Sequence, residues 1–269
     1  MWSGLTYLMQ IDTKIPDLIL IAGIFIALIF AVTVIYFVSN SLKRAKSINS
    51  AFTYLVYALA RAVEAKEEET GNHILRVGEF CALIARQLGM SGYFVEQIRV
   101  QAALHDIGKI HTPREILLKP EPLTPKEWEI MKKHTTFGAV IVGNHERLAM
   151  GRNIALTHHE KWDGSGYPCG LKGDAIPIEG QIIAIADQYD ALRSPRPYKP
   201  VYDHKTAYKM LTEGDGRIDP GHFSPRVLNA FKKVEAGFEA IYAKLKDTDA
   251  AREFAIDFCS LINVKKSLL

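Results

Sequence analysis

An uninterrupted apolar run near the amino terminus limits what this chain can fold into more than any other feature. Residues 18–38 read LILIAGIFIALIFAVTVIYFV and include no charged residue. As a helix the run is about 31 Å long, which matches the hydrocarbon thickness of a bilayer. A core helix is rarely apolar on every face over this length, and a signal peptide has a shorter apolar region with basic residues before it. The sequence therefore predicts a transmembrane helix at residues 18–38.

The charges beside this run predict its orientation. Lys43, Arg44 and Lys46 follow it, whereas the preceding segment has one lysine and two aspartates. Basic residues stay on the cytoplasmic side, so we expect residues 1–17 outside and the remaining chain in the cytoplasm. The three cysteines are widely scattered and form no CxxC motif, which agrees with a reducing compartment.

The rest of the sequence favours an all-α domain. Residues 47–69 contain no glycine or proline and continue as a helix, which either dimerises or packs on its own core. Further amphipathic segments predict helices at 74–88, 95–106, 180–192, 205–211 and from 227 onward, with loops at 163–177 and 195–225. Thr124, Pro125 and Glu127 form a helix-start signature. No stretch alternates as a strand does, and a formal net charge of +3 does not indicate a nucleic-acid polymer as partner.

Histidines and acids recur in patterned positions. Glu69 and His73 are four apart and share one helix face, while Asp187 lies in the apolar run IIAIADQYDAL. The other candidates are His105, Asp106, His134, His158 and His159. Each alone is more often a satisfied surface or core residue, and the spacings of EF-hands, zinc fingers and HEXXH sites are absent.

Taken together, these residues favour a divalent metal site. Ionised carboxylates among apolar residues cost several kcal/mol, roughly, unless a cation compensates them. Imidazole and carboxylate ligands without thiolates suit iron, manganese or zinc. Eight candidate ligands are too many for one ion, so we expect two or three ions that share carboxylates. Such a cluster can lower the pKa of a bridging water and hold both reacting oxygens of a phosphoester.

Two motifs with histidines and acids resemble those of a known family. HDIGK at 105–109 and HHEKWDGSGYP at 158–168 resemble the two signatures of the HD-GYP domain, a bacterial branch of the HD metal-dependent phosphohydrolases. The similarity extends in order over about residues 51–231, through EAKEEETGNHILRV, LLKPEPLT, MKKH, LKGDAIPIEGQIIAIADQYDAL and RPYKP.

The resemblance implies an all-helical HD-type bundle that hydrolyses cyclic di-GMP to pGpG or GMP. It implies metal ligands at Glu69, His73, His105, Asp106, His134, His158, His159 and Asp187. Two or three divalent ions, iron or manganese, would be the cofactors. Asp106 and Lys109 would be catalytic, and Lys109, Tyr167, Arg196 and Lys199 would bind the substrate. Gly164 and Gly166 would allow the loop before Tyr167 to approach closely.

The resulting organisation is a single-pass protein of the bacterial inner membrane. Its expected parts are an external segment at 1–17, the membrane helix at 18–38, a basic linker at 39–50, the catalytic domain at 51–231 and a helical extension at 232–269. Three alternatives stay open: a cyclic di-GMP receptor without turnover, a phosphodiesterase for another cyclic dinucleotide, and a general nucleotide phosphohydrolase. The complete ligand set argues against the receptor. The GYP loop, named for Gly166, Tyr167 and Pro168, argues against the general phosphohydrolase.

Overall fold

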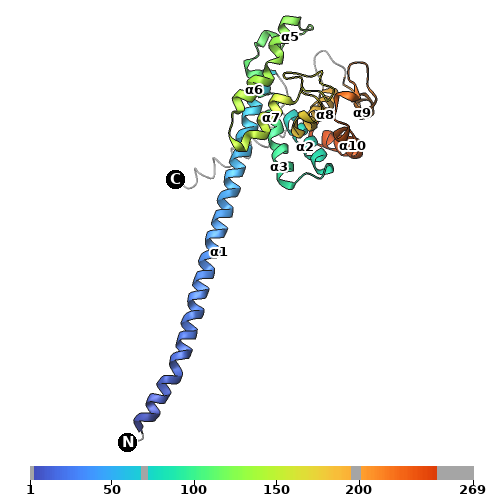
Figure 1. The fold of residues 1–269 in the computed structure, drawn as a ribbon. Helices are drawn as coiled ribbons and strands as arrows, with labels where there is room; N and C mark the ends of the chain where they lie inside the picture. The colour runs from blue at the N-terminus through green and yellow to red at the C-terminus, as the bar shows by residue number, and fades with distance from the viewer. Residues whose placement is uncertain (1–2, 68–71, 195–200, 247–269) are drawn as a thin grey trace. The chain divides into compact units, whose positions relative to one another are not determined.

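The structure, a computed structural model, describes residues 3–67, 72–194 and 201–246. Every regular element in these ranges is helical, as the sequence predicts (Figure 1). The chain divides into two compact units, residues 1–53 and 54–269. Helix α1 (Ser3–Glu67) belongs to both, because it continues from the first unit into the second.

The first unit is the amino-terminal part of α1. The side chains of residues 18–38 are exposed, and the most apolar 18-residue window has a mean hydropathy of 3.2 with none of it buried. By length and composition α1 is thus able to cross a membrane from Leu18 onward. The helix runs without a break through the predicted basic linker at 39–50.

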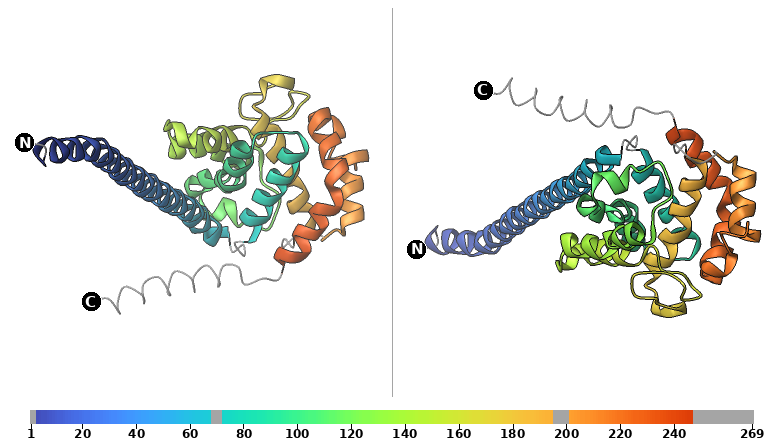
Figure 2. Two further views of the ribbon diagram at one scale, coloured as in Figure 1. Left: turned by 90° about the horizontal axis from the view of Figure 1, so that it is seen from below. Right: turned by 90° about the horizontal axis from the view of Figure 1, so that it is seen from above.

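The second unit has its core between α2 (Asn72–Gln87), α8 (Ile178–Arg193) and α10 (Pro225–Lys246) (Figure 2). Phe80 stacks on Phe238 with ring centroids 4.4 Å apart, and Tyr189 meets Phe80 edge-on at 5.2 Å. Burial of such large apolar side chains contributes roughly 1.5–3 kcal/mol each, so this aromatic cluster anchors the three helices. α9 (His204–Glu213) covers α8 and α10.

A second group of elements packs beside this core. α3 (Gly92–Gln101) lies against α2, and α7 (Ala149–Thr157) lies against α3, α6 (His134–Val142) and α8. The short elements are η1 (Ala102–Leu104), η2 (Ile107–His111), α4 (Arg114–Leu117), α5 (Pro125–Lys132), η3 (Glu146–Leu148), η4 (Gly173–Ala175) and η5 (Pro220–His222). The predicted Thr124 cap is confirmed, including its reciprocal bond with Glu127.

One local prediction is wrong, and two helices were missed. The single helix expected at 95–106 ends at Gln101 and tightens into the 3₁₀ helices η1 and η2. Close packing against α6 explains the tighter winding, since a Cβ on Gly108 would lie 1.9 Å from the carbonyl oxygen of His134. Helices α6 and α7 were not predicted. α6 reads HTTFGAVIV, whose β-branched residues and glycine have weak helix propensity, so tertiary packing decides its form.

Candidate metal centre

Five separate segments deliver histidines and acids to one place in the second unit. His73 begins α2, and the pair His105–Asp106 lies between η1 and η2. His134 begins α6, His158 follows α7, and the remaining side chains are His159 and Asp187 of α8. His105 and Asp106 stand at the junction of η1 and η2, where 3₁₀ turns take the place of the expected regular helix.

Four of these histidines are held through the same ring nitrogen. Nδ1 of His105 is 2.9 Å from the Ala102 carbonyl oxygen, and Nδ1 of His134 is 2.7 Å from that of Met131. His158 Nδ1 lies 3.1 Å from two backbone carbonyls, and His73 Nδ1 lies 2.8 Å from the Asp190 carboxylate. Each partner is an acceptor, so Nδ1 carries the proton and donates. Nε2 is then the nitrogen that faces the centre, the atom through which each of these histidines can ligate a metal ion.

The Nε2 atoms converge. Nε2 of His73 and His105 are 3.3 Å apart, and those of His134 and His158 are 3.2 Å apart. Asp106 stands between the two pairs: its Oδ2 lies 3.1 Å from His105 Nε2, and its Oδ1 lies 3.3 Å from His134 Nε2. One carboxylate therefore faces both pairs, as a bridging ligand does.

These separations fit divalent ions. Two ligand atoms that each lie about 2.0–2.1 Å from one ion at tetrahedral or octahedral angles are about 2.8–3.4 Å apart. Asp106 Oδ1 is buried without a hydrogen-bond donor among the described residues. The donor set forms two groups that share Asp106, and within each group the ligand atoms lie within 4.8 Å of one another: His73, His105 and Asp106, and Asp106, His134, His158 and His159. Asp187 Oδ1 adds a carboxylate 3.6 Å from His73 Nε2.

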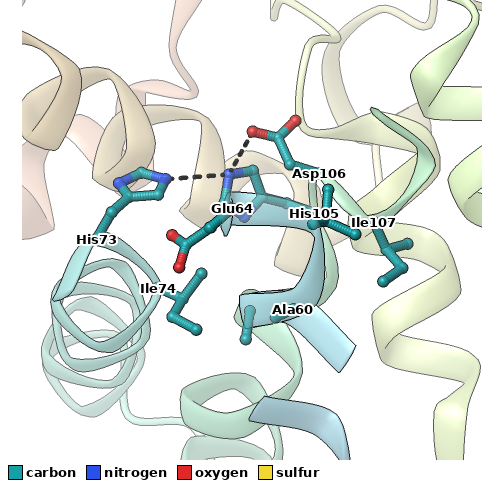
Figure 3. A pocket seen from close by; sticks show the side chains of 9 residues that line it. Ala60, Glu64, His73, Ile74, His105, Asp106 and Ile107 are labelled. Carbon is teal, nitrogen blue, oxygen red and sulfur yellow. Dashed lines mark hydrogen bonds and ion pairs between the residues drawn. The ribbon is translucent and has the colours of Figure 1, made fainter. Parts of the chain in front are cut away.

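A small cavity adjoins the first group. Glu64 of α1 lines it together with His73, His105 and Asp106, and apolar side chains complete its wall. Figure 3 shows the Glu64 carboxylate directed toward His73. Glu64 is almost fully buried, so this negative charge adds to those of Asp106 and Asp187 on the same side of the centre.

The two sides of the centre differ electrostatically. Burial lowers the pKa of His105, but Asp106 and Asp187 oppose it and raise the pKa to about 10. Burial and the neighbouring His158 lower the pKa of His134 to about 4, against the opposing charge of Asp106. Burial, His158 and His134 hold the pKa of His159 well below its usual range. The acidic side thus attracts a cation, while the other side presents neutral imidazoles.

Lys109 lies beside the centre and is held from two directions. Its Nζ is 2.8 Å from Asp106 Oδ2. Burial raises the pKa of Asp106, but Lys109 and His105 outweigh it and hold the pKa well below its usual range. The Lys66 ammonium of α1 donates to the carbonyl oxygens at the end of η2, at 3.4 Å for Lys109, 3.1 Å for Ile110 and 2.6 Å for Thr112. The last turn of α1 therefore anchors the helix that carries Lys109.

The segment after His159 folds back over it. Both oxygens of the buried Glu160 carboxylate accept backbone N–H groups, from Cys169 at 2.7 Å and from Leu171 at 3.0 Å. A Cβ on Gly166 would lie 2.3 Å from the Lys161 nitrogen, so only glycine allows this approach. Gly164 has a φ of +87°, as the sequence predicts for the turn.

The fold-back brings Tyr167 onto the centre. Its ring stacks on His159 with centroids 4.7 Å apart. Burial and the Asp106 charge raise the pKa of its phenol. The tyrosine thus forms a wall beside the neutral imidazoles.

The structure brings together most of the residues that the sequence singled out. Seven of the predicted ligands meet, namely His73, His105, Asp106, His134, His158, His159 and Asp187. Lys109 and Tyr167 lie beside them. The predicted ligand Glu69 and the predicted substrate contacts Arg196 and Lys199 lie outside the described residues.

Sequence reasoning missed the residues that support the ligands. The fully buried Asp190 carboxylate accepts from His73 Nδ1 at Oδ2 and from the Arg76 guanidinium at both oxygens, with 2.8 Å from Arg76 Nη2 to Oδ2. One signal was available: Arg76 follows His73 by three positions and Asp190 follows Asp187 by three, so each pair shares a helix face.

A known protein family and several curated proteins resemble this chain. The family model described as HD domain matches residues 57–221. A cyclic di-GMP phosphodiesterase of Thermotoga maritima is 47% identical over 190 residues, covering 70% of this chain and 50% of its own. A 3′3′-cGAMP-specific phosphodiesterase 2 of Vibrio cholerae is 43% identical over 195 residues, covering 72% of this chain and 37% of its own. The chain thus spans about half or less of these curated relatives.

A solved structure supports the fold alone. A cyclic GMP-AMP-specific phosphodiesterase from Vibrio cholerae superposes with a TM-score of 0.53 at 17% sequence identity. The match covers 75% of this chain and 52% of that one.

Proposed function

This chain belongs to the HD-domain family, in its HD-GYP branch, and we propose that it is a metal-dependent phosphodiesterase that hydrolyses cyclic di-GMP to pGpG or GMP. The observation that carries the proposal is the convergence of three histidine Nε2 atoms on the two oxygens of Asp106, those of His105, His134 and His158. His73 Nε2 lies beside His105, and Lys109 lies beside Asp106. A binding module has no need of so many imidazole and carboxylate ligands in one buried place.

The donor set fits two ions that share Asp106. His134, His158 and His159 would hold one ion, and His73, His105 and Asp187 the other. Iron and manganese suit imidazole and carboxylate ligands, and Glu69 stays a predicted ligand for a third ion. When bound, the ions would lower the pKa of a nucleophilic water and neutralise charge on the phosphodiester.

The chain's own residues bind and orient the substrate. Asp106 keeps its charge at neutral pH and turns both oxygens inward. The Lys109 ammonium stabilises negative charge that develops on the phosphoryl oxygens, with Arg196 and Lys199 as further predicted phosphate contacts. The Tyr167 ring, stacked on His159, closes one wall and excludes water from that side.

A second candidate substrate has a specific observation in its favour. The relative named a 3′3′-cGAMP-specific phosphodiesterase 2 is nearly as similar to this chain as the one named for cyclic di-GMP. Both dinucleotides present the same phosphodiester to the centre. The distinction therefore rests on base contacts rather than on the metal ligands.

One experiment tests the activity and its substrate. The full chain in detergent micelles, loaded anaerobically with Fe²⁺ or Mn²⁺, is incubated with cyclic di-GMP, 3′3′-cGAMP and cyclic di-AMP, and products are separated by chromatography. We expect pGpG or GMP from cyclic di-GMP and loss of both metal and turnover in Asp106→Ala. Binding of cyclic di-GMP without any product would favour the receptor alternative.

The proposed location is the bacterial inner membrane, with residues 18–38 as the span and the second unit in the cytoplasm. The exposed apolar surface of α1 and the basic residues after it support this. A carboxy-terminal alkaline phosphatase fusion, active only outside the cytoplasm, should stay inactive. Cross-linking along residues 47–53 distinguishes a homodimer through this helix from a helix that packs only on its own chain.

A further inference from the structure

A large, partly exposed aromatic side chain stands at the edge of the centre. Trp128 on α5 is 45% exposed, although its indole is among the most costly side chains to leave in water. It stands on the short helix that precedes His134. A tryptophan left open at this place suggests a surface that a ligand covers.

The backbone that carries Trp128 belongs to a capped helix start. Thr124 and Glu127 bond reciprocally at the start of α5, and the Lys119 ammonium holds the Glu127 carboxylate at 2.7 Å. Trp128 follows directly, and its backbone N–H donates to the Thr124 carbonyl at 2.9 Å. The indole is therefore presented from a first turn whose capping groups are satisfied.

Trp128 also continues a line of rings that leads to the ligands. Its ring meets Tyr167 nearly edge-on, with centroids 6.1 Å apart and planes at 77°. Tyr167 in turn stacks on His159 at 4.7 Å. Trp128 thus lies one ring beyond the wall of the centre.

We propose that Trp128 is the stacking surface for a purine base of the substrate. This inference rests on the proposed function, because it takes the phosphodiester to lie at the metal centre. Stacking uses the π face that guanine and adenine share, so Trp128 contributes affinity for both and discriminates weakly between them. Relatives named for cyclic di-GMP and for 3′3′-cGAMP both resemble this chain, which agrees with a base-tolerant surface.

The test is equilibrium binding of mononucleotides that are not turned over. GMP and AMP are titrated into the full, metal-loaded chain by calorimetry, with inorganic phosphate as a probe that lacks a base. Trp128→Ala should weaken GMP and AMP alike, by roughly 5- to 150-fold, since stacking contributes about 1–3 kcal/mol per base. Trp128→Phe should retain more of the affinity, and phosphate should bind all three proteins equally.

Tyr93→Ala is the matched control, because it removes a 72% exposed aromatic ring from α3. It should leave GMP and AMP affinity unchanged. Wild-type affinity in Trp128→Ala would overturn the inference. An equal loss of phosphate binding would also overturn it, because the indole would then act by supporting Tyr167. Since GMP and AMP binding is measured without turnover, it can be read even if no cyclic dinucleotide is hydrolysed.

Discussion

His73 Nδ1 lies 2.8 Å from Asp190 Oδ2, although 117 positions separate the two residues. The same carboxylate receives the Arg76 guanidinium, and all three side chains are buried. Burial raises the pKa of Asp190, but Arg76 and His73 outweigh it and hold the pKa well below its usual range. Asp190 therefore stays ionised and sets which nitrogen of His73 faces the centre.

Asp190→Asn should weaken metal binding without removing a proposed ligand. The amide keeps the shape but not the charge, so His73 loses its fixed orientation. We expect divalent metal affinity to fall roughly 10- to 100-fold. The free energy of unfolding should fall by about 3–5 kcal/mol, because Arg76 is left as an uncompensated buried charge. Metal titration and denaturant unfolding measure the two effects.

Asp174→Asn supplies the control, since it neutralises an exposed aspartate in η4. It should change neither quantity by more than experimental error. Full metal affinity in Asp190→Asn would show that His73 is oriented by other contacts.

The GYP loop offers a second prediction. Gly166→Ala forces a methyl group against the backbone of residues 159–161. One backbone atom each of His159, Glu160 and Lys161 lies within 2.6 Å of the new Cβ. The loop must move outward, and Tyr167 loses its stacking on His159. We expect a stability loss of about 1–3 kcal/mol and a larger loss of turnover. Thermal unfolding and phosphodiesterase assays at one temperature separate the two.

Gly92→Ala provides the comparison, because nothing lies within 4 Å of the added Cβ at the start of α3. That variant should keep wild-type activity. Unaltered activity in Gly166→Ala would mean that Tyr167 is not needed in its observed position.

Sequence pattern predicted the members of the centre because their spacing is local. HD at 105–106 and HH at 158–159 place two candidates side by side whatever the fold, and the apolar run around Asp187 marks a buried acid. The structure adds what local spacing does not contain. The contacts of Asp190 with His73 and with Arg76 span 117 and 114 positions, and that of Lys66 with Thr112 spans 46. Such contacts exist only after the helices pack.

The tight turns around the ligands were unpredictable for a related reason. An apolar pattern at 95–106 suits an α-helix, but it does not record that Gly108 must fit against the His134 carbonyl. The close packing decides between α and 3₁₀ winding. The same holds for α6, which forms because it packs on η2 and α7 and not because its residues favour helix.

A pH prediction follows from the start of α5. The Lys119 ammonium and the Thr124 backbone N–H lower the pKa of Glu127 from 4.5 to about 2. A lowered folded-state pKa stabilises the protein above the unfolded value, and this contribution is lost as pH falls from about 4.5 toward 2. The stability difference between wild type and Glu127→Gln should therefore be largest near pH 7 and shrink toward pH 3.

Comparing the two proteins at each pH cancels the titration of the histidine cluster, which both share. Denaturant unfolding at pH 7, 5 and 3 gives the difference. Glu129→Gln, which breaks a surface pair with Lys132 on the same helix, is the control for removing any carboxylate from α5. A difference that stays constant across this range would contradict the assignment.

The last prediction concerns the contact between α1 and η2. Lys66→Met keeps the apolar stem but removes an ammonium that donates to three carbonyl oxygens at the end of η2. Loss of a charged hydrogen-bonding group should cost about 1.5–3 kcal/mol of stability. Because η2 carries Lys109, a shift of its end should also lower kcat roughly 10- to 100-fold with little change in bound metal. Lys66→Arg, which restores the charge and several donors, should recover most of both losses, whereas the exposed Lys205→Met should lose neither. Rates are compared well below the unfolding temperature, so that every variant is folded. If kcat of Lys66→Met then equals that of the wild type, Lys66 stabilises the fold without positioning Lys109.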